Sequence, residues 1–575
     1  MTRYLVTSAL PYANGPIHFG HVTGAYLPAD VYVRTLRMQG EEVLYVCGTD
    51  EHGTAITIGA EQENVPYADY VARWRGEIKR TFDAFGIEFD IFSGTSICPD
   101  HVATSQEFFR AIDTNGYMTF GPSEQLYCPK DQRFRADRYL VGTCYFCGYE
   151  QARGDECPRC GKDLEALLLV NPACKVCGTA TEKRTTNHWY LDLPKLRDEH
   201  IGTWFRGHPW KANVEGFIGN MLEKLRPRAI TRDMKWGVPV PPDRAQGEEG
   251  KVLYVWFDAP IGYVSMTKEW ARNAGKPDDW KRWWLSEDTR LVHFIGKDNI
   301  SFHCLIFPSM LYGTKQGYVL PWQVPANEFY NLQGGKFSTS LNWTIPVDDF
   351  VARFDAEAAR FYLLASAPET ADSEFRWPEF QSCVNASLAD TIGNLVTRVL
   401  RFIDKYYDSC IPPIADRHKA ELDQTMLQEC GAFGDPAVHI REFRFRRAAE
   451  ELVRCASVAN RFVDVRAPWA LRKTDPELAA SVLNTCCQWL AWLARWMAPF
   501  MPKKAQRLWT MLGQGGLVAR ESWPGLPESG RWRTLPAGQK LGVVEGLFVK
   551  IQDETVAAEV ALLESRRPAV VEEKR

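Results

Sequence analysis

Short apolar runs that end in polar residues recur along the first two thirds of the chain. The segments 4–15, 41–53, 251–263 and 289–303 each contain an apolar strand-like run that gives way to a polar turn. Strands that alternate with helices pair in parallel and bring their C-terminal ends to one edge of the sheet. The pattern therefore predicts an α/β fold with an open parallel sheet and a functional site above that edge.

Helical spacing of apolar residues marks two other parts of the chain. A helix is predicted from about Phe19 to Met38, where Pro28 is expected to introduce a kink. After about residue 380 the apolar positions follow a helical period, which predicts an all-α bundle. The stretches that carry this pattern are 387–407, 443–463 and 478–498, and a short final helix is expected over 554–566.

Length and composition indicate a protein of several domains. The 575 residues are 45% hydrophobic and 24% charged, and the formal net charge is −4, so nucleic-acid contacts would need a local basic patch. The longest apolar run, 486–500, is interrupted by Gln488 and Arg495 and is shorter than the roughly 20 residues of a membrane span. No signal-peptide pattern is found, so we expect a cytoplasmic protein without a membrane segment.

Cysteines cluster in one part of the chain. Seven of the 16 lie between Cys128 and Cys177, mostly in pairs, which favours metal ligands in a reducing compartment over disulfides. Two Cys-x2-Cys knuckles supply four thiolates, the ligand set of a closed, structural zinc site. These ligands are Cys144, Cys147, Cys157 and Cys160.

A second set of ligands lies in the same region. Cys174 and Cys177 form another knuckle, and Cys128 and Asp131 precede it in the chain. Aspartate is a zinc ligand, although structural sites use it less often than cysteine. Two interpretations stay open: three cysteines and one aspartate hold a second zinc ion, or this site is empty.

Two segments carry residues suited to phosphate. In 15–21, GPIHFGH, a turn leads to His18 and His21 at the start of the predicted helix, and Gly20 allows close approach of a ligand. Taken alone, such histidines are more often packing or surface residues than ligands.

The second segment is 332–343, LQGGKFSTSLNW. It is not a Walker motif, because Phe337 follows Lys336. After this lysine the loop presents three hydroxyl residues, Ser338, Thr339 and Ser340.

These segments resemble the signatures of one enzyme family. HFGH resembles the HIGH signature of class I aminoacyl-tRNA synthetases, and KFSTS resembles their KMSKS loop. Further stretches resemble the methionyl-tRNA synthetases over nearly the whole chain and in the same order: ALPYANGPIHFGH, CGTDEHG, AITRDMKWGVPVP, YVWFDAPIGY, HFIGKDNISFH and LFVKIQDETVAAEV.

The resemblance implies activation of L-methionine by ATP to methionyl-adenylate, followed by transfer to tRNA(Met). Catalysis would consist mainly of positioning and of stabilising phosphate charge. His18 and His21 are implied to bind the phosphates, Lys336 to close over their β/γ side, and Arg232 to make a further contact, with Mg²⁺ accompanying ATP. The implied ATP-binding loop residues are Gly20, Lys336, Ser338, Thr339 and Ser340.

The resemblance also implies a methionine pocket. A flexible apolar chain with a polarizable sulfur suits aromatic walls, and Asp50 would hold the α-amino group. Without the resemblance, Trp256 and Tyr263 would be interpreted as core residues. The implied pocket residues are Leu10, Tyr12, Asp50, Trp256, Ala259, Pro260, Tyr263, Ile300 and His303.

In the helical part, the resemblance implies recognition of the CAU anticodon by Asn394, Arg398 and Trp469. Unpaired bases stack on aromatic rings and accept hydrogen bonds from polar side chains. Taken alone, Trp469 would be a packing residue at a helix boundary.

The loop at 332–343 departs from the usual family form. Thr339 replaces a second lysine, and Leu341 replaces the arginine of a frequent form, so we expect a working loop with slower activation. One alternative is a tRNA-binding paralogue with weakened activity and a regulatory role, and another is a ligase for a different aliphatic amino acid. The retained pocket and anticodon residues favour the methionine ligase.

The implied fold class is a Rossmann-type class I synthetase domain with an inserted zinc-knuckle connective domain, followed by an all-α anticodon-binding bundle. Because the chain stops soon after this bundle, we expect a monomer. The predicted segments are 1–115 and 232–325 (the catalytic halves), 116–231 (the insertion), 326–380 (the KMSKS-type loop and stem-contact region), 381–530 (the helical domain) and 531–575 (the tail).

Overall fold

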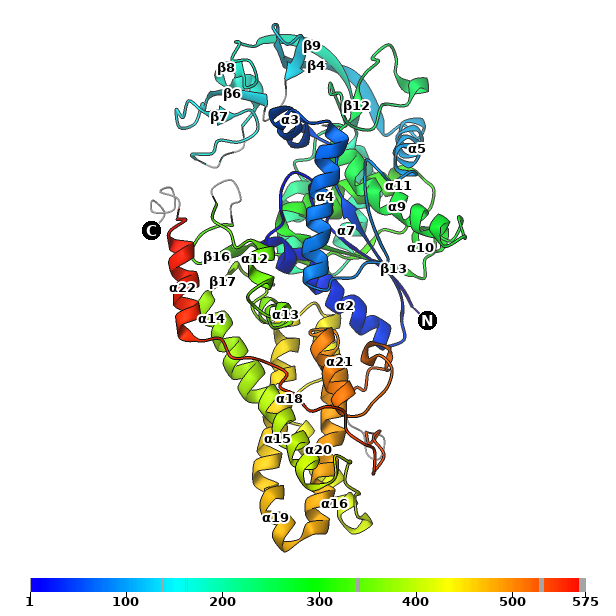
Figure 1. Cartoon of the computed structure of the whole chain (residues 1–575). Helices are drawn as coiled ribbons and strands as arrows, with labels where there is room; N and C mark the ends of the chain where they lie inside the picture. The colour runs from blue at the N-terminus through cyan, green and yellow to red at the C-terminus, as the bar shows by residue number, and fades with distance from the viewer. Residues whose placement is uncertain are drawn as a thin grey trace.

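The protein has three tiers, which Figure 1 shows from top to bottom. This computed structural model describes residues 2–135, 139–160, 162, 164–337, 342–526 and 532–567. A cysteine-rich region of small sheets lies at one end, a parallel sheet with helices forms the middle, and long helices form the other end. The predicted fold class is confirmed, because a parallel α/β core carries an inserted cysteine-knuckle region and an all-α region follows it.

The central sheet is parallel, as its apolar runs predict. Its strands are β1 (Arg3–Ser8), β2 (Glu42–Thr49), β3 (Ile91–Gly94), β13 (Thr289–Gly296) and β14 (Pro321–Gln323), with β15 (Ala326–Asn327) beside β13. The order is β14-β13-β1-β2-β3, so the direction of winding reverses between β1 and β13. In open α/β sheets, ligands bind beyond the C-terminal ends of the strands at such a switch point.

Helices cover both faces of this sheet. Tyr4 and Val6 of β1 share a buried cluster with residues of α4 (Tyr67–Ala84), whereas Leu5 shares another with residues of α5 (His101–Thr114) and α9 (Val255–Asn273). Successive strand residues point to opposite faces, so the sheet is buried on both sides and its C-terminal edge is left for a site.

The helix predicted from Phe19 to Met38 is present, but its middle is π-helical. Pro28 lies in the first turn after the π-helical stretch, and it has no N–H to donate. The wider turn therefore precedes a residue that would interrupt a regular α-helix. The three parts are α1 (Phe19–His21), η1 (Val22–Tyr26) and α2 (Leu27–Met38).

The inserted region is built on a long antiparallel pair. β4 (Met118–Cys128) pairs with β9 (Glu182–Leu191), and β10 (Arg228–Ala229) pairs with the end of β9 as the chain returns to the core through α8 (Ala212–Leu222). A separate small sheet carries the cysteine knuckles. Its strands are β6 (Leu140–Thr143), β7 (Ala152–Arg153) and β8 (Val170–Cys174).

Long helices form the C-terminal region, as the apolar spacing predicts. The longest apolar run lies on α20, where Trp489, Trp492 and Trp496 are buried, which confirms a core helix. Across the part of the chain that the structure describes, no helix is long and apolar enough to cross a membrane. The main helices are α15 (Asn394–Tyr406), α16 (Asp416–Cys430), α18 (Phe445–Arg466), α19 (Pro468–Thr474), α20 (Pro476–Met497) and α21 (Pro502–Met511).

The last helix returns toward the core. α22 (Asp553–Glu564), which corresponds to the helix predicted over 554–566, packs beside α14 (Trp377–Ser382), as Figure 1 shows. Gln381 donates to Asp553 Oδ1 at 2.7 Å. The end of the described chain therefore covers the junction between the sheet and the long helices.

Candidate active site and metal centres

A large cavity lies at the switch point of the sheet. Its volume is about 910 Å³, and its walls come from the ends of β1, β2 and β13, from α1 and α9, and from the segment around β16 (Tyr330–Leu332). It brings together segments that lie far apart in the sequence. The residues predicted to bind ATP or methionine that line it are Leu10, Tyr12, His18, Gly20, His21, Asp50, Trp256 and Lys336.

Backbone hydrogen bonds fix the tautomer of the two histidines. His18 Nδ1 accepts the N–H of Gly20 at 3.1 Å, and His21 Nδ1 accepts the N–H of His18 at 3.2 Å. A neutral imidazole that accepts at Nδ1 carries its proton at Nε2. Desolvation by the surrounding protein lowers the pKa of His18 well below its usual value, with a contribution from His21, and lowers the pKa of His21 to about 4, although the His21 side chain is open to the cavity. Both rings are therefore neutral Nε2–H donors at pH 7.

The start of the glycine-rich loop lies against these histidines. The rings of His18 and Phe337 stack with centroids 4.6 Å apart and planes 10° apart. Lys336 lines the cavity, with its Nζ 5.0 Å from the ring centroid of Phe329. The two segments predicted to bind phosphate thus meet. The predicted residues Ser338, Thr339 and Ser340, together with Leu341, lie outside the described residues.

Asp50 is held rigidly at the end of β2. Its N–H donates to Pro11 O at 2.9 Å, and its carbonyl accepts from the N–H of Ala13 at 2.9 Å. Burial raises the pKa of its carboxyl group well above the usual value, and the charge of Asp258 adds to the shift. A cationic ligand would favour the ionised carboxylate and oppose this shift, so the position suits an ammonium group.

The predicted methionine wall is only partly exposed to the cavity. Leu10, Tyr12 and Trp256 line it, whereas Tyr263 and His303 are buried, with Tyr263 Oη 2.8 Å from His303 Nε2. These two, with Ala259, Pro260 and Ile300, are not among the described lining residues. The structure therefore places part of the predicted set behind the cavity wall.

Sequence reasoning missed several residues of the site. Phe302 stacks on Trp256 with ring centroids 3.8 Å apart and planes 6° apart. No spacing in the sequence signals this contact, because it joins two different helical segments. Phe302 itself is not among the described lining residues, whereas the missed residues that do line the cavity include Arg228, Gly296, Asp298, Asn299 and Glu328. Those directly after β13 could have been found from the rule that ligands bind beyond strand ends.

Arg232 is placed beside the cavity and not within it. It lines a neighbouring cavity of about 420 Å³ between α3 (Thr54–Glu63) and the inserted region. Its guanidinium carbon lies 3.6 Å from the ring centroid of Tyr254, which does line the larger cavity. The structure does not bring Arg232 together with the histidine pair, so its phosphate contact stays a prediction.

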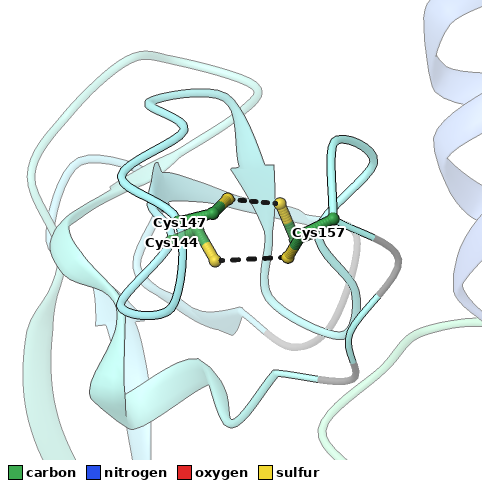
Figure 2. Close-up of side chains that lie close together, drawn as sticks. Cys144, Cys147 and Cys157 are labelled. Carbon is green, nitrogen blue, oxygen red and sulfur yellow. Dashed lines mark hydrogen bonds between the residues drawn. The ribbon is translucent and has the colours of Figure 1, made fainter. Parts of the chain in front are cut away.

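The four cysteines of the first predicted metal site converge. Figure 2 shows the side chains of Cys144, Cys147 and Cys157 pointing toward one another from two loops. The Sγ atoms of Cys147 and Cys157 are 3.6 Å apart, and those of Cys144 and Cys160 are 3.9 Å apart. Tetrahedral zinc with Zn–S bonds of about 2.3 Å requires S–S separations of about 3.8 Å. The cluster therefore fits a zinc ion.

The second predicted set also converges. Cys174 Sγ lies 3.1 Å from Asp131 Oδ2, and Cys128 Sγ lies 3.4 Å from Cys177 Sγ. Arg135 donates to the same Asp131 oxygen at 2.6 Å and, as the main cause, holds the pKa of that carboxyl group below its usual value. These donors can hold a metal, but the guanidinium competes for one carboxylate oxygen.

The predicted anticodon residues lie on one face of the helical region. Asn394 begins α15 and is exposed, and Arg398 follows one turn later. The guanidinium carbon of Arg398 lies 5.1 Å from the ring centroid of Trp469, which is 42% exposed, and Arg398 pairs with Asp464 at 2.6 Å. An exposed tryptophan beside an arginine provides a stacking surface for an unpaired base.

A parallel sheet with a histidine pair at its switch point and a lysine loop beside it is the catalytic arrangement of a class I aminoacyl-tRNA synthetase. The family model for "tRNA synthetases class I (M)" matches residues 4–400, and that for the "Anticodon binding domain of methionyl tRNA ligase" matches residues 417–564. The chain belongs to the methionyl-tRNA synthetase family.

Known relatives match over nearly the full chain. The methionine–tRNA ligase of Rubrobacter xylanophilus is 44% identical over 96% of this chain and 96% of its own length. That of Flavobacterium psychrophilum is 42% identical over 100% of this chain and 82% of its own length. The solved Mycobacterium tuberculosis methionyl-tRNA synthetase in complex with methionyl-adenylate has a TM-score of 0.76 at 25% identity, covering 95% of this chain and 100% of that one.

Proposed function

We propose that this chain activates L-methionine with ATP, forming methionyl-adenylate and pyrophosphate, and then charges tRNA(Met) for translation initiation and elongation. The cavity at the β1/β13 switch point carries the proposal, because His18, His21, Lys336 and Asp50 all line it. The likeness to a synthetase solved with methionyl-adenylate supports the same assignment.

In the activation step, the methionine carboxylate attacks the α-phosphorus of ATP and pyrophosphate leaves. The Nε2–H groups of His18 and His21 donate to phosphate oxygens, and the ammonium of Lys336 offsets negative charge on the β/γ side. The hydroxyl groups of Ser338, Thr339 and Ser340, and the guanidinium of Arg232, are assigned to the same phosphate chain. Mg²⁺ bound to ATP would supply further charge compensation.

The amino acid is held at both ends. Asp50 binds its ammonium group, while Leu10, Tyr12 and Trp256 contact the apolar chain and sulfur. After activation, the terminal ribose of tRNA(Met) attacks the acyl carbonyl and AMP leaves. Asn394, Arg398 and Trp469 are assigned to the anticodon, which selects the tRNA.

Zinc is proposed as the structural metal of Cys144, Cys147, Cys157 and Cys160, where a closed thiolate set leaves no position for substrate. A second zinc would be held by Cys128, Asp131, Cys174 and Cys177. We further propose a monomer that acts in the cytoplasm. No feature of the described site favours the alternative of a weakened tRNA-binding paralogue.

ATP–pyrophosphate exchange dependent on methionine tests the function directly. We expect exchange by the wild type and a roughly ten- to hundredfold lower rate for Lys336→Ala, because a charge-assisted contact contributes about 1.5–3 kcal/mol. Lys419→Ala, an exposed lysine on α16, serves as the matched control. Absence of exchange from folded, zinc-loaded wild type would favour the paralogue instead.

A further inference from the structure

The wall of the active-site cavity contains a cation from the inserted region. Arg228 lies on β10, which pairs with the end of β9, and it lines the cavity together with residues of the catalytic core. Among the described lining residues, Arg228 and Lys336 are the only arginine and lysine. In the sequence, Arg228 comes just before the second half of the catalytic core and Lys336 comes after that half.

The guanidinium of Arg228 lies beside aromatic rings and not beside a carboxylate. Its guanidinium carbon lies 5.5 Å from the ring centroid of Phe302 and 6.0 Å from that of Trp256, the stacked pair beside the predicted methionine site. Within the described parts of the chain, its side chain makes no ion pair or hydrogen bond with a carboxylate. Burial lowers its pKa, and Arg232 contributes to this shift.

Two other shielded arginines of this protein are paired with carboxylates. Arg34 pairs with Asp30 at 2.8 Å, and Arg533 pairs with Asp423 at 2.8 Å. Among the acids that line the cavity, Glu328 is paired with Lys297 at 2.7 Å. A partly desolvated guanidinium without a counter-charge is unfavourable unless a ligand supplies one, so the position of Arg228 calls for an anion in the cavity.

We propose that Arg228 binds a substrate oxyanion at the aromatic end of the cavity. The proposal rests on the proposed function, which supplies two sources of this chemistry: the carboxylate of methionine, or a phosphodiester near the 3′ end of tRNA. The carboxylate fits better, because Arg228 adjoins Trp256 and methionine needs a cation for its carboxylate as it needs Asp50 for its ammonium. A guanidinium binds a carboxylate through two parallel hydrogen bonds.

The reaction gives this contact a kinetic signature. The carboxylate loses its negative charge as it becomes the acyl group of the adenylate, so a contact to it is stronger in the ground state than after attack. Loss of such a contact raises KM more than it lowers kcat. Arg228→Gln should raise the KM for methionine at least tenfold in the exchange reaction, with a smaller change in kcat.

Methioninol keeps the ammonium group and the side chain of methionine but lacks the carboxylate. Comparing the binding of the two ligands therefore separates recognition of the carboxylate charge from packing of the side chain. By calorimetry, Arg228→Gln should lower the affinity for methionine at least tenfold and leave methioninol within about twofold. Arg228→Lys should recover part of the methionine affinity. Arg226→Gln, an exposed arginine that is absent from the described lining, should match the wild type in both.

The other possible results also distinguish the proposal from its alternatives. Unchanged methionine binding with slower single-turnover transfer from preformed adenylate to tRNA would assign the oxyanion to the tRNA end. Equal losses for methionine and methioninol, or no change in any measurement, would overturn the proposal and leave Arg228 as a packing residue. Because binding is measured without catalysis, failure of the wild type to catalyse exchange would count against the proposed function and not against Arg228.

Discussion

The histidine pair has the geometry to bind phosphate without carrying charge. His18 and His21 each use Nδ1 to accept a backbone N–H, and desolvation by the surrounding protein lowers the pKa of both rings. A neutral ring at the start of a helix supplies a directed N–H donor. The positive charge that offsets the phosphates must then come from other groups, which are Lys336, the assigned Arg232 and the Mg²⁺ that accompanies ATP, so the lysine of the loop becomes important.

The fixed tautomer predicts different effects of two substitutions at His21. The amide nitrogen of glutamine reaches the place of Nε2, whereas that of asparagine reaches only the place of Nδ1. His21→Gln should keep more of the exchange rate than His21→Asn, by roughly tenfold, since one hydrogen bond to a charged group is at stake. Rates at saturating ATP would measure this, and equal rates would show that Nε2 does not donate.

The lowered pKa of His21 also predicts the pH dependence of activation. With a folded-state pKa of about 4, below the usual 6.5, the ring stays neutral as pH falls from 8 to 6 and gains a proton only near pH 4. The exchange rate should therefore show no step from His21 between pH 6 and 8. A step in that range that disappears in His21→Gln would contradict the low pKa.

Residues that act through a motif were predictable, and residues that act through tertiary contact were not. His18, His21, Lys336 and Asp50 follow from short segments of the sequence, and all line one cavity. Arg228 lines this cavity, and Phe302 stacks on the lining residue Trp256, only because β10 and the segment after β13 meet at α9. No local pattern encodes that meeting.

At the scale of elements, the cysteine knuckles show how backbone turns prearrange a metal site. Cys144 Sγ accepts the N–H of Phe146 at 3.4 Å. Burial raises the pKa of this thiol, but backbone donors such as this one lower it, and the pKa falls to about 7. Backbone N–H groups that stabilise a thiolate favour metal binding at neutral pH. The spacing of the cysteines was therefore a sufficient signal for the convergence of these four side chains.

The second cluster predicts a weaker metal site that one substitution should strengthen. Asp131 shares Oδ2 between Cys174 and Arg135, so its carboxylate is a poorer ligand than a thiolate. We expect a chelator to remove one zinc readily and another slowly from the wild type, and Asp131→Cys to make both slow. Metal content during chelation, followed by a coloured indicator, measures this.

The control for that experiment is Asp198→Cys, which adds a thiol at an exposed position of the same region. It should release zinc as the wild type does. If Asp131→Cys and the wild type hold the same number of zinc ions with the same release rates, the second cluster does not bind metal through position 131.

At the scale of the whole molecule, order along the chain was predictable and contact between distant segments was not. Strand and helix patterns predict the parallel sheet, the inserted cysteine region and the helical bundle, and the boundaries of the six predicted segments remain predictions. The return of α22 to α14 depends on contacts such as Gln381 with Asp553, which join residues far apart in sequence. Hydrophobic periodicity carries no information about such pairings.

One buried arginine joins the catalytic and helical tiers. Arg360 of α13 (Ala356–Ala365) is fully buried and donates to Asp30 Oδ2 at 2.7 Å, to Phe85 O at 2.7 Å and to Phe500 O at 2.9 Å. Although burial opposes ionisation, the guanidiniums of Arg34 and Arg360 hold the pKa of Asp30 below its usual value. Helix α2 and the residues that follow α4 and α20 thus meet on a single side chain.

Replacing Arg360 by methionine should destabilise the protein strongly. The change leaves buried carbonyl oxygens without donors and removes one of the two arginine partners of the buried Asp30 carboxylate, which costs about 3–5 kcal/mol. Arg353→Met is the matched control, because Arg353 is partly exposed and its pair with Glu559 should contribute about 1 kcal/mol or less. Thermal unfolding followed by circular dichroism compares the two, and similar melting temperatures would show that Arg360 does not join the tiers. If Arg360→Met also lowers tRNA charging more than pyrophosphate exchange, the same side chain keeps the anticodon-binding helices in register with the active site.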